Sequence, residues 1–257
     1  MADKVTLLKT RLAEIARSLE HHPNGLGLLG LGSAGIEIDR MDQFSDLDFF
    51  AIVAPGYKQQ FIADLAWLSN ISPIAWYFKN TPDGHKLLFA DGVFCEFAVF
   101  EPQELQDIPF SQGQFIWRDS ALDSSLAIPQ VTLPQPCQDE AFLLGELLTN
   151  LYVGLCRYHR GELLSAMRFI QIYAVDRLIN LIDISRDKQH TVDQDVFCLD
   201  RRVEQRHPEF QTLLLNVSQG ANKSIESVQM MLDFVKQTYP VNEHLEGEIK
   251  RLLVKNV

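Results

Sequence analysis

The sequence predicts an α+β protein in which an N-terminal domain with a mixed sheet precedes a C-terminal helical bundle. Short apolar runs bounded by turn residues follow one another between residues 25 and 118, which is typical of strands. Beyond residue 138 the apolar residues recur at helical spacing. Between these regions, residues 119–137 hold prolines among small and polar residues, a composition typical of a domain boundary. We therefore expect domains at residues 1–125 and 138–257.

Composition excludes several classes of protein. With 257 residues, of which 46% are hydrophobic, the chain suffices for one large domain or two ordinary ones. Acidic residues outnumber basic ones by 34 to 23, giving a net charge of -11, which argues against a nucleic-acid partner. The four cysteines lack metal-site spacing, so we expect reduced packing residues. The sequence contains neither a secretory signal pattern nor an apolar run of membrane length. We expect a cytoplasmic protein without a membrane partner.

The N-terminal elements follow from periodicity and turn residues. Apolar residues at helical spacing predict an amphipathic helix over residues 3–20. A second helix is expected after Pro55-Gly56, with an inner face that includes Phe61 and Leu68. The predicted strands are residues 26–31, 49–53 and 74–78, then a hairpin of 86–90 and 93–100 around Asp91-Gly92, and a short edge strand at 115–118.

The C-terminal pattern is helical throughout. Pro208 is expected to interrupt the third helix, because proline removes a backbone donor and clashes with the preceding turn. Gly220 and Pro240 separate the later helices. The predicted helices are residues 139–158, 162–184, 201–217, 221–239 and 241–254.

One N-terminal stretch concentrates residues suited to phosphate chemistry. An apolar run ends in Gly32-Ser33, and the chain returns through Ser45-Asp46-Leu47-Asp48 into a second apolar run. Side chains alternate along a strand, so Asp46 and Asp48 point the same way with Cα atoms about 6.6 Å apart. The glycines fit neither a Walker loop, since no Gly-Lys-Ser/Thr follows, nor a dinucleotide fingerprint, since no long helix follows. Two carboxylates at a Gly-Ser turn suit a hard cation held against a phosphate.

Glu96 is an isolated charge in the apolar run from Val93 to Phe100. A lone glutamate there is best explained as a charge that faces water from an edge strand. Beside Asp46 and Asp48 the balance reverses, because three carboxylates repel one another unless a cation lies between them. Mg²⁺ takes carboxylates together with substrate phosphates, so the sequence predicts a magnesium site if the three carboxylates converge.

Together, Gly32-Ser33, Ser45-Asp46-Leu47-Asp48 and Glu96 resemble the pattern of the polymerase β-type nucleotidyltransferases over residues 25–100. That family has a Gly-Ser turn, an Asp-x-Asp/Glu pair on the next strand and a third acidic residue on a later strand. The helical half resembles the antibiotic nucleotidyltransferases, and the larger lincosamide nucleotidyltransferases in particular. Segments 150–155, 157–162, 165–171 and 201–206 carry this second likeness.

The resemblance implies transfer of AMP from Mg·ATP to a hydroxyl group of a small molecule, with a lincosamide antibiotic as acceptor. Asp46, Asp48 and Glu96 would be the catalytic residues and the ligands of two Mg²⁺ ions, with Glu96 as the general base. Ser45 would orient the loop. The nucleotide would contact Gly32, Ser33 and Ser45. Because basic residues must balance the triphosphate, we also expect Arg40 to contact the nucleotide and Arg160 and Arg168 to contact the substrate or its phosphates. Tyr158 could line the acceptor pocket.

Several alternatives stay open at this level. Solvated surface positions are the better interpretation of the arginines. The aromatic stretch Trp76-Tyr77-Phe78 could line an acceptor pocket, but core packing is the better interpretation of it. A second hypothesis is that the acceptor is an aminoglycoside, because an acidic protein suits a polycation equally well. A third reading is a toxin–antitoxin or regulatory nucleotidyltransferase that modifies a macromolecule, and a fourth is a non-catalytic nucleotide-binding subunit. The resemblance also suggests a homodimer.

Overall fold

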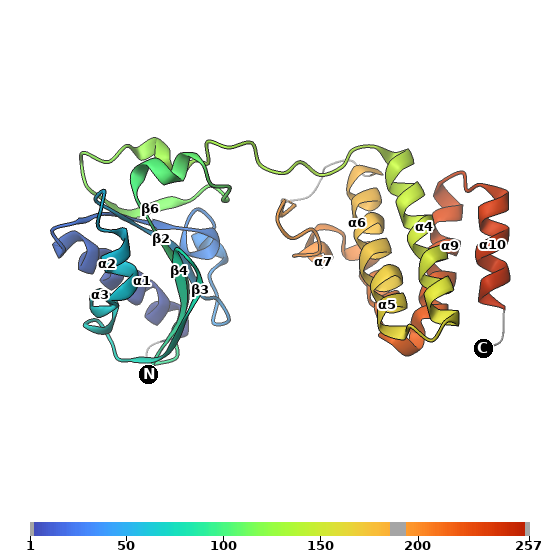
Figure 1. Ribbon diagram of the computed structural model, residues 1–257, viewed down its shortest axis with the longest axis horizontal. Coiled ribbons are helices and arrows are strands. Elements are labelled where there is room, and N and C mark those ends of the chain that lie inside the picture. The colour runs from blue at the N-terminus through green and yellow to red at the C-terminus, as the bar shows by residue number, and fades with distance from the viewer. Residues whose placement is uncertain (1–2, 186–193, 255–257) are drawn as a thin grey trace. The chain divides into compact units, whose positions relative to one another are not determined.

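The computed structural model describes residues 3–185 and 194–254. These residues form two compact units that divide between Leu133 and Pro134, within the segment expected to be a boundary. Each of the predicted domain ranges, 1–125 and 138–257, lies inside one unit. The first unit contains a sheet with helices and the second is helical (Figure 1), which is the α+β composition predicted from the sequence.

The first unit is built on a six-stranded sheet with strand order β3-β4-β5-β2-β1-β6. Strands β2 and β5 run parallel, whereas the other neighbouring pairs are antiparallel, so the sheet is mixed as predicted. The strands are β1 (Gly25–Gly30), β2 (Leu47–Val53), β3 (Ile74–Thr81), β4 (Gly84–Phe89), β5 (Phe94–Phe100) and β6 (Gln114–Arg118).

Three helices cover one face of the sheet: α1 (Lys4–His21), α2 (Lys58–Ala63) and α3 (Ala66–Ser69) (Figure 1). Their apolar side chains share one core with alternate residues of the central strands. Phe49 and Phe97 stack there with ring centroids 5.3 Å apart, and Trp67 meets both rings edge-on. We call this the helix-covered face.

Among the described residues of the first unit, the elements that pack on the opposite face cover only part of its length. At the C-terminal ends of β2 and β5, Ile52 and Phe100 pack against Leu105 and Leu126, which lie on the 3-10 turns η3 (Pro102–Gln106) and η4 (Ser124–Ala127). Towards the N-terminal ends of β2 and β5 the same face carries polar side chains. We call it the open face.

Two N-terminal expectations need correction. The aromatic stretch of β3 is not core: Trp76, Tyr77 and Phe78 are 49%, 56% and 44% exposed, because β3 is an edge strand. The helix expected after Gly56 is two short helices, α2 and α3. The chain is extended at Asp64, whose Oδ1 accepts a hydrogen bond from the Ala66 amide at 2.9 Å, and this local bond competes with a continuous helix.

The helical unit departs from prediction mainly in continuity. A π-helical turn interrupts the predicted helix 162–184, and Pro208 divides the predicted helix 201–217 as expected. None of the helices that the structure describes is both long and apolar enough to cross a membrane. The elements are α4 (Glu140–His159), α5 (Leu163–Arg168), the π-turn η5 (Phe169–Tyr173), α6 (Ala174–Ser185), α7 (Val203–Arg206), the 3-10 turn η6 (Pro208–Phe210), α8 (Gln211–Asn216), the 3-10 turn η7 (Ala221–Lys223), α9 (Ser224–Thr238) and α10 (Glu243–Leu253).

Candidate functional site

The Gly-Ser turn follows directly from β1. Gly32, Ser33 and Ala34 form the 3-10 turn η1, and Gly32 has φ +49°, a conformation that costs other residues energy. The turn folds back closely on the strand: a Cβ atom on Gly30 would lie 1.9 Å from the carbonyl oxygen of Ala34. The two glycines are therefore requirements of this compact turn.

The turn is joined to the acidic strand by the backbone. The Leu31 amide donates a hydrogen bond to the carbonyl oxygen of Asp48 at 2.8 Å. Asp46 precedes β2 by one residue and Asp48 lies within it, and both are half-buried. Because Leu47 and Phe49 belong to the helix-covered core, strand alternation places Asp46 and Asp48 on the open face. The predicted pair thus lies beside the Gly-Ser turn.

Glu96 joins this pair through the pairing of β2 and β5. These strands are parallel, and Asp48 stands opposite Glu96. On the far side of β5, Glu96 stands opposite Lys86 of β4, and Lys86 stands opposite Phe78 of β3. We call these four residues the cross-strand row. Neighbouring strands lie about 4.8 Å apart, so the structure brings Asp48 and Glu96 together as the sequence suggested.

Both carboxylate oxygens of Glu96 have partners. Lys86 Nζ lies 2.9 Å from Oε2, and Asn80 Nδ2 donates to Oε1 at 3.0 Å. The pKa of Lys86 is raised mainly by its hydrogen bond to Glu96 and by the charge of that carboxylate, with smaller contributions from Asp48 and Asp46. The Lys86 ammonium group therefore lies in the electrostatic field of all three acids.

Sequence reasoning did not select Lys86. The hairpin was expected to turn over two residues, Asp91-Gly92, which would put Lys86 opposite Phe97. The observed connection also includes Ala90, since the Phe89 amide bonds to the Val93 carbonyl, and this shifts Lys86 opposite Glu96. The sequence thus predicted the hairpin with its register displaced by one residue. A one-residue displacement moves each side chain of a strand to the other face of the sheet.

Two of the three acids suit a magnesium ion. No group of three or more Asp, Glu, His or Cys residues that could hold a metal occurs among residues 3–185 and 194–254, and the Glu96 oxygens bond to Lys86 and Asn80. Asp46 and Asp48 fit better, because Mg²⁺ is usually held by one or two carboxylates and completed by substrate phosphates and water. Metal binding by Asp46, Asp48 and Glu96, and the number of ions, stay predictions.

The loop between the turn and β2 contains the predicted residues Arg40 and Ser45. Arg40 Nη2 pairs with Glu37 Oε2 at 2.5 Å, and a Cβ on Gly32 would lie 3.5 Å from the same nitrogen. The guanidinium group is therefore next to the Gly-Ser turn. Ser45 Oγ accepts the Asp42 amide at 3.0 Å, so Ser45 closes a local turn. The Ser33 residue is 8% exposed.

The remaining predicted residues belong to the helical unit. Tyr158 lies near the end of α4, and its ring meets that of His159 edge-on at 5.8 Å. Arg160 is exposed, with Nη1 4.0 Å from Glu162 Oε1, and Arg168 ends α5 in an exposed position. These exposures agree with the solvated reading of the two arginines, and a role for the three residues in substrate binding stays a prediction.

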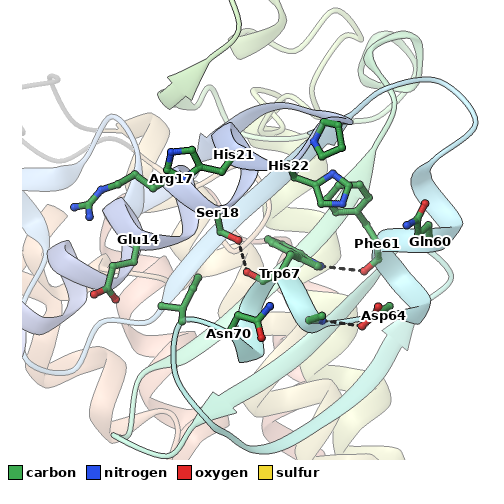
Figure 2. A pocket seen from close by; sticks show the side chains of 13 residues that line it. Glu14, Arg17, Ser18, His21, His22, Gln60, Phe61, Asp64, Trp67 and Asn70 are labelled. Carbon is green, nitrogen blue, oxygen red and sulfur yellow. Dashed lines mark hydrogen bonds between the residues drawn. The ribbon is translucent and has the colours of Figure 1, made fainter.

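Figure 2 shows a pocket of about 600 Å³ among the helices of the first unit. Ser18 Oγ bonds to the Trp67 carbonyl at 2.5 Å, and Trp67 Nε1 bonds to the Phe61 carbonyl at 3.1 Å (Figure 2). Phe61 and Trp67 belong to the helix-covered core, so this pocket lies on the other side of the sheet from the acids. Its walls are held by structural hydrogen bonds, and none of the predicted site residues lines it.

The chain has a weak likeness to a solved structure and no match among protein-family models or curated sequences. Among solved structures, the chain is similar to an aminoglycoside 6-adenyltransferase from Bacillus subtilis, with 14% identity and a TM-score of 0.39 over 93% of this chain and 95% of that one. Similarity at this level assigns neither a fold nor an activity, so function has to be inferred from the residues.

Proposed function

We propose that this protein is a nucleotidyltransferase that transfers AMP from ATP to a hydroxyl group of a small molecule. One observation carries the proposal: Asp48 and Glu96 face each other across parallel strands, and Asp48 is bonded through its backbone to the Gly-Ser turn. Asp46 lies two residues before Asp48. A tight turn beside acidic side chains at the N-terminal ends of β2 and β5 suits phosphoryl chemistry, which depends on positioning and charge stabilisation.

The Gly-Ser turn would receive the triphosphate. Gly32 leaves room for an anion because it has no side chain, and backbone amides of a tight turn bind phosphate oxygens. Arg40, whose guanidinium lies beside Gly32, would exchange Glu37 for a phosphate oxygen. Ser33 is buried, so its backbone amide is a better hydrogen-bond donor to the phosphate than its side-chain hydroxyl.

Asp46 and Asp48 would hold the magnesium ion that accompanies ATP. When bound, that ion supplies neutralisation of the phosphate charge and alignment for in-line displacement. The two aspartates would place the α-phosphate of ATP at the β2 end of the cross-strand row, next to Glu96, which stands opposite Asp48 on the neighbouring strand.

Glu96 would act as the base. The acceptor oxygen forms a bond to the α-phosphorus, its proton moves to a Glu96 carboxylate oxygen, and the bond from the α-phosphorus to the departing pyrophosphate breaks. Lys86 is protonated at neutral pH, and its hydrogen bond to Glu96 raises its pKa further above the ordinary value of 10.5. We assign Lys86 the role of orienting Glu96. Before Glu96 can take the proton, it must exchange one of its present hydrogen bonds for a hydrogen bond from the acceptor hydroxyl.

The order of preference among acceptors comes from the sequence resemblance. A lincosamide is our first candidate, an aminoglycoside the second, and a protein or tRNA the third. A net charge of -11 favours cationic acceptors in general and does not separate the two antibiotics.

The test is incubation of the purified chain with Mg²⁺, α-labelled ATP and lincomycin or kanamycin, followed by measurement of pyrophosphate and of an AMP-shifted product mass. We expect transfer that falls at least about a hundredfold in Asp48→Asn and Glu96→Gln. Asp107→Asn, an exposed acid at the end of η3, is the matched control and should leave the rate unchanged. Undiminished transfer by Asp48→Asn would refute the assignment of the site.

A further inference from the structure

Two large aromatic side chains lie exposed at the end of the cross-strand row. Trp76 and Phe78 are 49% and 44% exposed, and their ring centroids lie 5.1 Å apart. They are two residues apart on β3, so both face the same side. Phe78 stands opposite Lys86, which places the pair on the open face. We call these two residues the aromatic strip.

Hydrogen-bonding groups separate the aromatic strip from Glu96. Lys86 occupies the intervening strand, and Asn80 follows Phe78 by two residues on the same strand. Both donate to the Glu96 carboxylate, at 2.9 Å and 3.0 Å. The Glu96 carboxylate, the Lys86 ammonium and Asn80 amide groups, and the two aromatic rings therefore follow one another on the open face.

The strip lies on the opposite side of Glu96 from the Gly-Ser turn. The strand order is β3-β4-β5-β2-β1, with the turn at the end of β1, the aspartates at β2 and the aromatic strip on β3. ATP bound at the turn therefore approaches the acids from the β1 side. A second substrate approaching Glu96 from the β3 side would meet the aromatic strip about 10 Å away, two strand spacings.

We propose that the aromatic strip binds the acceptor and that this acceptor contains a hydroxylated ring of the sugar type. The inference rests on the proposed function and names the substrate class of the same site. The C–H face of such a ring packs on an aromatic ring, while its hydroxyls bond to polar groups at the edge, a combination that small-molecule sites use to fix orientation. Lys86 and Asn80 supply the donors, and Glu96 receives the proton of the reacting hydroxyl.

β3 also provides a matched control. Tyr77 lies between the two strip residues and is 56% exposed, but it stands opposite Leu87, a residue of the helix-covered core. Tyr77 is therefore an exposed aromatic side chain of the same strand on the other face. Loss of general stability or of surface apolar area would affect Tyr77→Ala as much as the strip variants, whereas loss of acceptor binding would not.

The experiment uses the full chain with lincomycin and kanamycin as probes. Binding is measured by saturation-transfer NMR without nucleotide, and KM is measured for each substrate where transfer occurs. We expect Trp76→Ala and Phe78→Ala each to weaken binding of an accepted probe about tenfold. The KM for ATP should not change in these variants. Tyr77→Ala should bind the probe as the unchanged protein does, and Trp76→Phe, which keeps an aromatic ring, should retain most of the binding.

The outcomes separate this inference from the proposed function. Transfer with a normal acceptor KM in a variant that combines Trp76→Ala with Phe78→Ala would overturn the aromatic strip as acceptor site, while the nucleotidyltransferase assignment would stand. Probe binding that depends on Trp76, without any transfer, would support the strip and refute the activity. Failure of both probes to bind would overturn the sugar-type acceptor. A lower molar mass of Trp76→Ala than of the unchanged protein, measured by light scattering, would also overturn the aromatic strip as acceptor site, because the strip would then contact a second copy of the chain.

Discussion

The two faces of the sheet in the first unit use the same strands for different purposes. On β2, Leu47 and Phe49 enter the helix-covered core, whereas Asp46 and Asp48 face the other side. On β5 the division repeats with Phe97 and Glu96. Alternate positions thus carry packing and chemistry, so substitutions one residue apart should have separable effects. Variants can test this comparison directly.

The largest effect is expected on the helix-covered face. Phe49 is 1% exposed and stacks on Phe97 at 5.3 Å. Phe49→Ala removes this packing and leaves a cavity, and we expect the free energy of unfolding to fall by about 3–5 kcal/mol. Urea denaturation followed by circular dichroism measures the change. A loss below about 1 kcal/mol would mean that this face does not carry the stability of the unit.

The neighbouring position on the open face should behave in the opposite way. Asp48→Asn keeps the side-chain shape but removes a charge that lies near Asp46 and Glu96, so we expect stability to stay within about 0.5 kcal/mol. Transfer of AMP should nevertheless fall at least about a hundredfold. Parallel measurement of unfolding and turnover on one preparation is the check. Equal effects of Asp48→Asn and Phe49→Ala on stability would remove the distinction between the faces.

The alternation of the two faces was readable from the sequence, but the lateral order of the strands was only partly readable. The approach of Asp48 to Glu96 followed from apolar runs and one isolated charge. Lys86 was missed because a one-residue difference in the Ala90–Gly92 connection changes which residues face each other. Trp76 and Phe78 were assigned to the core because their sequence does not reveal that β3 is an edge strand.

The helical unit was predicted in outline for a similar reason. Helical spacing identified the segments, and the proline rule placed the break at Pro208. The π-turn from Phe169 to Tyr173 was not predicted, since one widened turn leaves the apolar pattern on either side unchanged. Arg160 and Arg168 were proposed because basic residues must balance the triphosphate, and Tyr158 because it could line an acceptor pocket. Helical periodicity says nothing about these roles.

The Gly-Ser turn should show an effect of intermediate size. Gly32 has φ +49°, so Gly32→Ala forces a side chain into the left-handed region at a cost of about 1–2 kcal/mol. The added methyl group would also come within 3.5 Å of the Arg40 guanidinium, so we expect a higher KM for ATP as well. Equilibrium unfolding and ATP titration measure the two effects. An unchanged KM would separate the turn from nucleotide binding.

The smallest effect is expected in the pH dependence of the helix-covered face. His85 is 5% exposed and stacks on Phe97 at 5.7 Å. Burial lowers its pKa from the ordinary value of 6.5, and the charge of Lys79 lowers it further. The unfolded chain therefore takes up this proton more readily than the folded one, so the contribution of His85 to stability is complete above about pH 6.5 and declines as the pH falls below it.

His85→Phe keeps an aromatic ring at this position and removes the titration. We expect the melting temperature of the unchanged protein to fall more steeply than that of His85→Phe between pH 7 and pH 5. The comparison uses the difference between the two chains, so acids and histidines common to both cancel. His21→Phe, at an exposed position that ends α1, is the matched control and should follow the unchanged protein. Parallel curves for all three chains would show that His85 stays accessible to protons in the folded state, and the helix-covered face would then be less closed at β4 than its packing indicates.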